Sequence, residues 1–353
     1  MKCNVKTQNH SNRVPMWLPY LHSIRETKKG IFEFVFNGGT EIVNLNEISS
    51  IMIYGETDTK LDQKILDKIT RKGIPIIIHR RNMSQPIYIT GGLRPDKDDT
   101  ITEQLVKRQQ SRTSTHIARQ LLIAKMHSMS YLIPSAKVPQ FANIKTLRNI
   151  EATHAHKYWR AYFTKLNHPE WIRRDKNPAS EALDGASKFI SGIILRWITY
   201  HHLSPYHGFL HEPTDYPSLV YDLMEPTRGI FESILLQVFI NTNQKDWLVN
   251  SISELKMALD EQIYTSLTRQ IVTRQELLHG TVLSLKYYLL GRQRKFLIPL
   301  PGSPNGGRPP KVEFLLYGRH AGKTNFWEKA EIAANNDKWL KQKPRHFDHD
   351  HPF

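Results

Sequence analysis

Short apolar runs rich in β-branched and aromatic residues dominate the first hundred positions. Such runs, bounded by turn residues, predict strands at 31–36, 42–45, 51–54, 74–78 and 86–89. The first two flank an Asn-Gly-Gly sequence, which favours a tight hairpin because these residues readily adopt positive φ angles. Between later strands, apolar residues recur at helical spacing from Leu61 to Ile69. The pattern therefore predicts a small, mostly β domain with one helix.

The hydrophobic periodicity changes near residue 100. Beyond it, apolar residues recur at intervals close to 3.6, which predicts helices at 101–132, 145–165, 181–201, 218–224, 228–241, 247–290 and 325–341. A segment rich in Pro and Gly, 299–310, is expected to be an extended, mobile loop. The expected fold class is α+β, with a small β-rich N-terminal domain followed by a larger all-α domain.

These patterns divide the chain into five parts. We expect a β-rich domain over residues 1–94, a linker over 95–100, a helical domain over 101–298, the Pro/Gly-rich loop over 299–310, and a helical extension with a mobile tail over 311–353.

Composition changes this picture mainly through charge. The 353 residues include 49 Lys and Arg against 33 Asp and Glu, a formal net charge of +16, and 39% of them are hydrophobic, which excludes a wholly disordered chain. A strongly basic protein is attracted to polyanions, so nucleic acid is the favoured partner. Ribosome-like association, an anionic partner protein and plain solubility are the alternatives. Residues 101–353 hold 34 basic and 22 acidic side chains, so the larger domain carries most of this attraction.

Two features bear on the compartment. No apolar stretch reaches the length of a membrane span, and the first residues lack the apolar core of a signal peptide, so we expect a soluble, cytoplasmic protein. A single cysteine, Cys3, excludes an internal disulfide and a cysteine metal site.

Glu151 is the first candidate for chemistry. It lies in a predicted helix that otherwise carries bulky aromatic residues, and the small Ala152 and Ala155 beside it would leave room for a ligand or a metal ion. The alternative is a surface glutamate that pairs with Arg148 or Lys157.

A second group of polar residues follows some sixty positions later. Asp222 and Glu225 are three residues apart, so a helix would place both carboxylates on one face, and the preceding loop could bring His211 beside them. Neighbouring carboxylates repel unless a cation lies between them. Carboxylate oxygens with one imidazole suit Mg²⁺ or Mn²⁺, which assist phosphoryl transfer. The alternative is that the acidic residues only complement the helix dipole.

Other segments carry weaker signals. The tail holds alternating His and Asp at 346–351, a composition typical of adventitious metal binding. The segment 318–324 looks like a phosphate-binding loop, but its glycines are one residue too close. Several basic side chains fit either phosphate contact or an ordinary solvated helix face. They are Lys107, Arg108, Arg112, Arg148, Arg228, Lys286, Arg292 and Arg294.

Taken together, these motifs resemble those of a known family. Glu-Ala-x-x-Ala-x-x-Tyr-Trp at 151–159, Gly-Phe-Leu-His at 208–211 and Ser-Leu-x-x-Asp-Leu-Met-Glu at 218–225 occur in the order and spacing of the CRISPR-associated spacer-acquisition integrases, the Cas-one family. The β-rich domain, the linker and the helical domain also follow in that family's order, and the resemblance covers residues 25–290.

The resemblance implies a metal-dependent DNA endonuclease and integrase, which joins 3′-hydroxyl ends of short DNA fragments into a repeat array by transesterification. Carried over residue by residue, it implies catalytic and metal-binding roles for Glu151, His211, Asp222 and Glu225, with Mg²⁺ or Mn²⁺ as the cofactor. It also implies a homodimer formed through the β-rich domain, double-stranded DNA as fragment and target, and a small Cas-two family subunit as partner.

The departures from the family pattern leave alternatives open. The family's Asn-rich motif is replaced by Ser-Glu-Ala-Leu-Asp-Gly-Ala-Ser-Lys at 180–188, and neither the 299–310 loop nor the chain after Phe326 has a counterpart. A transposon-borne, casposase-like integrase of the same family therefore stays open. A branched-DNA repair nuclease and a non-catalytic basic DNA-binding scaffold are further alternatives. His211 is either a metal ligand or the general acid for the leaving 3′-oxygen.

Overall fold

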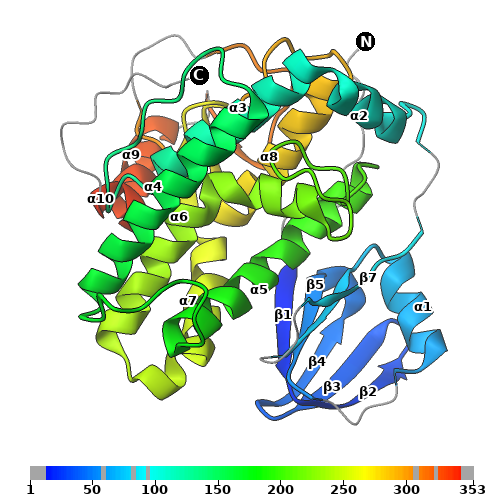
Figure 1. Ribbon diagram of the computed structural model, residues 1–353. Coiled ribbons are helices and arrows are strands. Elements are labelled where there is room, and N and C mark those ends of the chain that lie inside the picture. The colour runs from blue at the N-terminus through cyan, green and yellow to red at the C-terminus, as the bar shows by residue number, and fades with distance from the viewer. Residues whose placement is uncertain are drawn as a thin grey trace. The chain divides into compact units, whose positions relative to one another are not determined.

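The computed structural model describes residues 13–56, 61–80, 85–92, 96–304, 310–321 and 325–342. By their contacts they form two units, Met1–Gly92 and Leu93–Phe353, each considered by itself below (Figure 1). Cys3, the second half of the Pro/Gly-rich loop and the His- and Asp-rich tail lie outside the described residues.

The first unit contains two sheets and one helix. One sheet has the order β1 (Val14–Pro19), β5 (Ile48–Tyr54), β6 (Ile76–His79) and β7 (Ile87–Ile89), in which only the β6–β7 pair is antiparallel. The other is an antiparallel meander of β2 (Leu21–Lys28), β3 (Ile31–Phe36) and β4 (Gly39–Asn44), and the helix is α1 (Gln63–Arg71).

Alternation of buried and exposed side chains explains the meander. Phe32 and Phe34 on β3 are fully buried and pack with Ile51 and Ile53 of β5 in one apolar core. The predicted hairpin is confirmed, with Phe36 opposite Gly39 and a positive φ at Gly39. The sequence pattern missed β1 and β2, because prolines end β1 and charged residues interrupt the apolar positions of β2.

The second unit is mainly helical, which confirms the predicted fold class. Its helices are α2 (Thr100–Gln109), α3 (Ser111–Ser128), α4 (Ile144–Lys165), α5 (Pro178–Tyr200), α6 (Ser218–Asn241), α7 (Trp247–Asp260), α8 (Arg274–Leu289), α9 (Phe326–Asn336) and α10 (Lys338–Gln342). None of the helices in the described residues combines the length and apolar character that crossing a bilayer requires.

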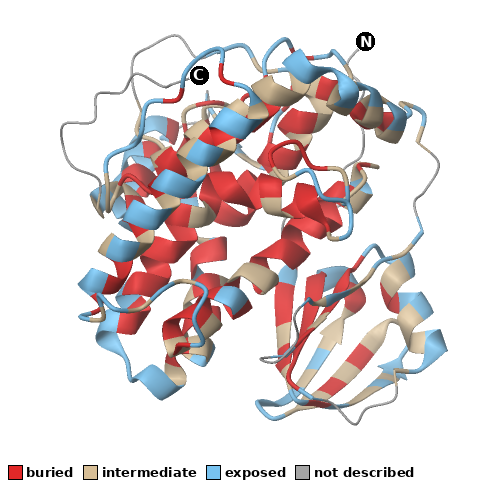
Figure 2. Ribbon diagram, viewed as in Figure 1, coloured by how far each residue is buried: buried red, intermediate tan, exposed pale blue. Residues whose placement is uncertain are grey.

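Helix α6 is the centre of this unit. It packs against α3, α5, α7, α8 and α10, and it is buried along nearly its whole length (Figure 2). A helix that is apolar on all sides is stable only inside such a bundle. Two predicted helices at 218–224 and 228–241 are therefore one, and the break expected near Pro226 is wrong because packing on both sides of Pro226 holds the helix together.

The second unit is not entirely helical, contrary to the expectation. The predicted helix 247–290 is divided by a hairpin of β8 (Gln262–Thr265) and β9 (Gln270–Thr273), and β10 (Gly318–His320) adds a third strand to it. Both β8 and β9 hold β-branched and aromatic residues, but each is only four residues long and lies between strong helix-forming sequences. The predicted helix 101–132 is also divided, since Gln110 has an extended backbone.

The described part of the Pro/Gly-rich loop is packed, which corrects the expectation of a mobile segment. Residues 299–304 form neither helix nor strand, but Leu300 is buried, and the Gly302 N–H donates to the carbonyl of Tyr264 at 2.9 Å. The loop therefore covers the three-stranded sheet of the second unit.

Candidate metal centre

Helix α4 carries Glu151 on its inward face. The side chains of Leu147, His154, Tyr158 and Tyr162 on this helix are buried, and Glu151 lies on the same face, four residues after Leu147 and three before His154. Ala152 is exposed, so it does not make room for a ligand as the sequence suggested. A carboxylate among buried positions of an amphipathic helix needs a partner in the interior.

The loop between α5 and α6 presents His211. Gln104 of α2 donates to the carbonyls of Ser204 and His207 and accepts from the Ser204 N–H. Arg108, also on α2, donates to the carbonyls of Gly208 and Glu212 at 2.8 and 2.6 Å. Helix α2 thus holds the loop on both sides of His211.

Gly208 permits the close approach of this loop to α6. A Cβ atom at this position would lie 2.8 Å from Asp222 Oδ2 and 2.6 Å from the His211 carbonyl oxygen. Its N–H donates to Ser218 Oγ at 3.0 Å, at the first residue of α6. No larger residue fits without moving the loop away from the helix.

Asp222 lies on α6 and is fully buried beneath this loop. Its Oδ2 accepts the N–H groups of Phe209 and Leu210 at 2.5 and 2.9 Å. Its Oδ1 accepts the N–H of His211 at 3.0 Å and contacts His211 Nδ1 at 2.7 Å. Both carboxylate oxygens are therefore used to hold the loop and the imidazole, and neither belongs to the group of atoms that could share a cation.

The contact with Asp222 determines how the His211 ring is used. A buried carboxylate only accepts hydrogen bonds, so Nδ1 carries the proton and a neutral imidazole presents the Nε2 lone pair. Nε2 lies 4.0 Å from Glu151 Oε1. Burial lowers the pKa of His211, but the hydrogen bond to Asp222 and the charges of Asp222, Glu225 and Glu151 outweigh it and raise that pKa above its usual value.

Glu225 lies one turn after Asp222 on α6 and is paired with two cations. Its Oε1 accepts from Arg228 at 2.9 Å, and its Oε2 lies 2.8 Å from the ammonium of Lys125. Burial raises the pKa of Glu225, but the charges of Lys125, Arg228 and His211 outweigh it and lower that pKa to about 2. Glu225 is therefore ionised at neutral pH.

Three elements that are distant in the sequence thus bring their side chains to one point. Glu151 of α4, His211 of the α5–α6 loop and Glu225 of α6 each offer one ligand atom, and these atoms all lie within 4.8 Å of one another. Among the described residues, these are the ones that form such a group. Two carboxylate oxygens and one imidazole nitrogen are a donor set for Mg²⁺ or Mn²⁺.

The predicted phosphate-binding residues fall into two classes. Lys107 is half-buried, and Arg112 and Arg294 are exposed. The others have partners within the protein: Arg108 and Arg148 hold the His211 loop, Arg228 pairs with Glu225 and Glu232, and Lys286 and Arg292 pair with Asp98.

Sequence reasoning missed the residues that assemble the site. Lys125 is among neither the predicted ligands nor the predicted phosphate-binding residues, yet its side chain is 6% exposed and contacts both glutamates of the group. Gln104 gave no signal, because polar residues are common on helices, and Gly208 was part of a family motif but had no role assigned to it. The Lys125 ammonium meets the two glutamates only when α3 packs against α4 and α6, and the sequence does not show this packing.

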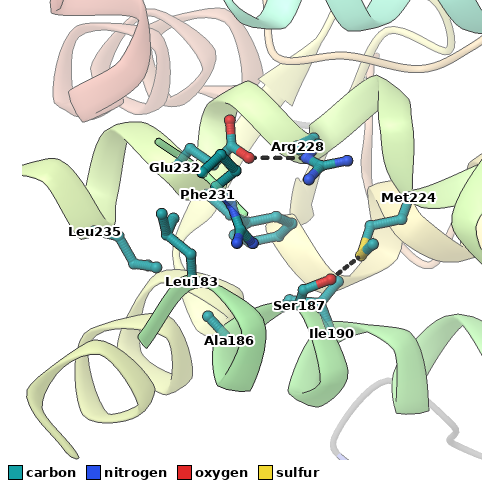
Figure 3. Close-up of a pocket in the computed structure, with 10 residues that line it drawn as sticks. Leu183, Ala186, Ser187, Ile190, Met224, Arg228, Phe231, Glu232 and Leu235 are labelled. Atoms are coloured by element: carbon teal, nitrogen blue, oxygen red, sulfur yellow. Dashed lines mark hydrogen bonds and ion pairs between the residues drawn. The ribbon is translucent and has the colours of Figure 1, made fainter. Parts of the chain in front are cut away.

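A small cavity borders Arg228 (Figure 3). It opens between α5 and α6, and the Arg228–Glu232 ion pair forms its polar edge. The rest of its lining is mainly apolar: Leu183, Ala186, Ile190, Met224, Phe231 and Leu235. Glu151, His211 and Glu225 do not line it, so it is separate from the convergence of ligand atoms.

Comparison with known proteins gives a family match for part of the chain and the fold of most of it. The sequence profile described as "CRISPR associated protein Cas1" matches residues 132–271. A casposase bound to its integration product has a TM-score of 0.68 at 16% identity, covering 80% of this chain and 93% of the casposase. A TtCas1–DNA complex has a TM-score of 0.60 at 13% identity, covering 87% of this chain and 99% of TtCas1.

A third solved structure, described as a Cas6-RT-Cas1–Cas2 complex, has a TM-score of 0.66 at 13% identity and covers 82% of this chain and 36% of its own. No curated protein matches the chain. At these identities the structural likenesses show the fold. The Cas1 family model thus matches residues 132–271, and the chain shares the fold of Cas1 proteins and of a casposase.

Proposed function

We propose that this protein is a metal-dependent DNA integrase and endonuclease of CRISPR adaptation, which joins 3′-hydroxyl ends of short DNA fragments into a repeat array. The observation that carries the proposal is the convergence of Glu151, His211 and Glu225, with ligand atoms within 4.8 Å of one another. The formal net charge of +16 favours a polyanionic substrate.

The donor set fits a divalent cation. Ligands about 2.0–2.1 Å from one octahedral cation stand about 2.9 Å apart when adjacent and about 4.1 Å apart when opposite. Glu151 Oε1 and His211 Nε2 are 4.0 Å apart, so these side chains would have to move slightly closer to become adjacent ligands of one ion. Glu151, His211 and Glu225 would hold the ion, and Asp222 would orient His211 without touching the ion, as carboxylates behind metal-bound imidazoles do.

The bound ion supplies charge neutralisation at a phosphate and a lower pKa for an attacking hydroxyl. His211 is better suited to be a ligand than a general acid, because its proton is on Nδ1, facing Asp222 and away from the glutamates. Arg228 holds Glu225 from the side opposite Lys125, so this carboxylate keeps its direction.

The reaction exchanges one phosphodiester bond for another. The 3′-oxygen of the incoming strand forms a bond to a target phosphorus, the bond from that phosphorus to the target's own 3′-oxygen breaks, and the leaving oxygen takes up a proton. No covalent protein intermediate is needed. Water in place of the 3′-hydroxyl gives nicking, so we expect metal-dependent endonuclease activity as well.

A casposase-like, transposon-borne integrase is the second candidate function. It is favoured by the likeness to the casposase structure, whose TM-score of 0.68 exceeds those of the TtCas1 complex and the Cas1–Cas2 complex. The chemistry is the same, but the substrate is a transposon end in place of a spacer. Sequencing of integration junctions separates the two, because spacers enter at a repeat boundary.

The partners we propose are double-stranded DNA, a second copy of the chain and a small Cas2-type subunit. A Cas1–Cas2 assembly is among the solved structures with this fold. We propose that the second copy binds through this β-rich unit, where Ile42 is 62% exposed. Light scattering of the full chain at several concentrations, with Ile42→Lys as the test variant, checks the dimer.

The test of the activity is a strand-transfer assay. Purified protein, Mn²⁺ and a labelled duplex with 3′-hydroxyl ends are mixed with supercoiled plasmid, and wild type is compared with Glu151→Gln and His211→Ala. We expect label on the plasmid only with wild type. Glu170→Gln, an exposed carboxylate, is the matched control and should join DNA normally.

A duplex with 3′-deoxy ends separates joining from cutting. It should lose joining and keep nicking, since water is still available as the nucleophile. Nicking with no joining of either duplex would favour a repair nuclease or the absence of a required subunit. DNA binding without any strand cleavage, equal in wild type and Glu151→Gln, would favour a non-catalytic scaffold.

A further inference from the structure

Lys125 is a buried cation inside the candidate metal centre. It lies in the last turn of α3, and its ammonium is 2.6 Å from Glu151 Oε1 and 2.8 Å from Glu225 Oε2. Taking an ammonium out of water is costly, and these two carboxylates are the groups that compensate it.

The ammonium contacts the same glutamates that would hold a divalent cation. Glu151 Oε1 is the atom that lies 4.0 Å from His211 Nε2, and it is also an atom that Lys125 contacts. Glu225 has one oxygen on Arg228, which leaves Oε2, on Lys125, as the oxygen facing the group. Two cations cannot both lie between the same carboxylates, because their mutual repulsion is strong at low dielectric.

We infer that Lys125 is a displaceable internal counter-ion, which occupies the divalent cation's place in the metal-free protein and must leave when the metal enters. This rests on the proposed metal centre. The four-carbon stem of lysine lets the ammonium swing away while α3 stays in place. A divalent ion replaces it because it brings twice the charge and also engages His211, which Lys125 does not contact.

The exchange has two consequences. The metal-free protein keeps Glu151 and Glu225 together, since the ammonium screens their repulsion, so the site is formed before the metal arrives. The apparent metal affinity is lowered, because every binding event must also break two ion pairs of a buried lysine. Lys125 therefore sets the metal concentration at which the enzyme becomes active.

Calorimetric titration of the metal-free, full-length protein with Mn²⁺ tests the exchange. Lys125→Gln, which keeps a donor but removes the charge, should bind Mn²⁺ about tenfold or more tightly than wild type. Lys125→Arg, which keeps a fixed charge with more donors, should bind more weakly than wild type. Lys157→Gln, an exposed lysine of α4, is the matched control and should bind as wild type does.

Thermal unfolding gives a second readout that does not depend on catalysis. Without metal, Lys125→Gln should melt below wild type, because two carboxylates lose their counter-ion, and Mn²⁺ should raise its Tm by more than it raises that of wild type. If Lys125→Gln does not fold without metal, its recovery on adding Mn²⁺ and the weaker binding of Lys125→Arg still test the exchange.

The outcomes separate this inference from the proposed function. Equal or weaker Mn²⁺ binding by Lys125→Gln, with binding abolished in Glu151→Gln, overturns the exchange and leaves the metal centre standing. Binding that is unchanged in Glu151→Gln, or absent from every variant, overturns both. Binding by Lys125→Gln without measurable binding by wild type supports the exchange in its strongest form.

Discussion

At the scale of single residues, Asp222 shows how a buried carboxylate holds a loop and a side chain in place. It accepts three backbone N–H groups and contacts the His211 ring, so it fixes the loop, the ring plane and the proton position together. A carboxamide has one accepting oxygen in place of two and directs N–H groups at donors. The role of Asp222 is thus positional.

Replacing Asp222 by Asn hardly changes the volume of the side chain, but it should still impair the site. We expect Mn²⁺ affinity and strand transfer to fall by about 10- to 100-fold, the range typical of groups that orient metal-bound imidazoles. The same titration and joining assay measure both. Asp215→Asn, an exposed carboxylate of the same loop, should leave both unchanged; a comparable loss there would point to the loop in general and not to Asp222.

His154 gives the metal-free protein a pH dependence of stability. Burial lowers the pKa of His154, opposed by a hydrogen bond to the Pro134 carbonyl and reinforced by the charges of Lys125 and Lys157. The unfolded chain therefore takes up a proton at this residue more readily than the folded one. The stabilisation is present above the unfolded pKa of about 6.5 and is lost as the pH falls below it.

Between pH 7.5 and pH 5.5, we expect the Tm of His154→Gln to fall less than that of wild type. The glutamine amide can still donate to the Pro134 carbonyl. Melting curves in the presence of a chelator measure this. His156→Gln, on the exposed face of α4, should keep the wild-type difference. An equal drop for His154→Gln and wild type would mean that other histidines carry the dependence.

At the scale of elements, the C-terminal helices act on the site through α3. Trp339 of α10 is fully buried, donates its Nε1–H to the Ser128 carbonyl at 2.8 Å and stacks edge-on against His127. Ser128 lies one turn after Lys125 and also accepts the N–H of Gly229 on α6 through its hydroxyl. The α3 end that carries Lys125 is thus fixed from two sides.

Trp339→Ala should destabilise the protein by about 3–5 kcal/mol, the usual cost of removing a large buried aromatic side chain. Strand transfer should fall with it, because the end of α3 loses its anchor. Trp339→Phe should keep most of the packing and lose about 1 kcal/mol for the hydrogen bond. Denaturant unfolding measures all three proteins.

The control is Trp327→Ala on the neighbouring helix α9, where the side chain is 44% exposed. It should change stability by less than about 0.5 kcal/mol. Normal stability of Trp339→Ala would show that α10 does not support the end of α3.

The sequence could predict the candidate site better than the elements that assemble it. Glu151, His211, Asp222 and Glu225 lie in local patterns whose spacing and residue types can be recognised along the chain. Lys125, Gly208 and Trp339 acquire their roles only through contacts with other elements: Lys125 with Glu151 and Glu225, Gly208 with Asp222, and Trp339 with Ser128. The β8–β9 hairpin was missed for a related reason, since its strands become favourable only when packed under α9 and the 299–304 loop.

At the scale of the whole molecule, the basic residues are of two kinds: some are exposed to solvent, and others form contacts within the protein. Arg112 is exposed and its positive charge faces solvent, whereas Arg108 holds the carbonyls of Gly208 and Glu212. The first kind of residue can neutralise a DNA phosphate and the second supports the His211 loop. Counting net charge alone does not separate them.

The two arginines should therefore respond differently to substitution. Arg112→Gln should lower the slope of log affinity against log salt concentration for duplex DNA by about one and weaken binding uniformly across sequences. Arg108→Gln should leave that slope unchanged and reduce strand transfer. Fluorescence anisotropy at several salt concentrations and the joining assay measure this pair, and equal slopes for wild type and Arg112→Gln would exclude a phosphate contact there.

The residues that form and support the site come from many parts of the chain, and this limits which segments can be exchanged with those of a related protein. The stretch that matches the family profile, 132–271, contains all of the candidate ligands but lacks Lys125, the α2 residues that hold the loop, and α10. A chimera that exchanges only this stretch would separate the ligands from their supports. The natural crossover point lies near residue 92, where one unit ends, so that the whole of 93–353 is inherited together.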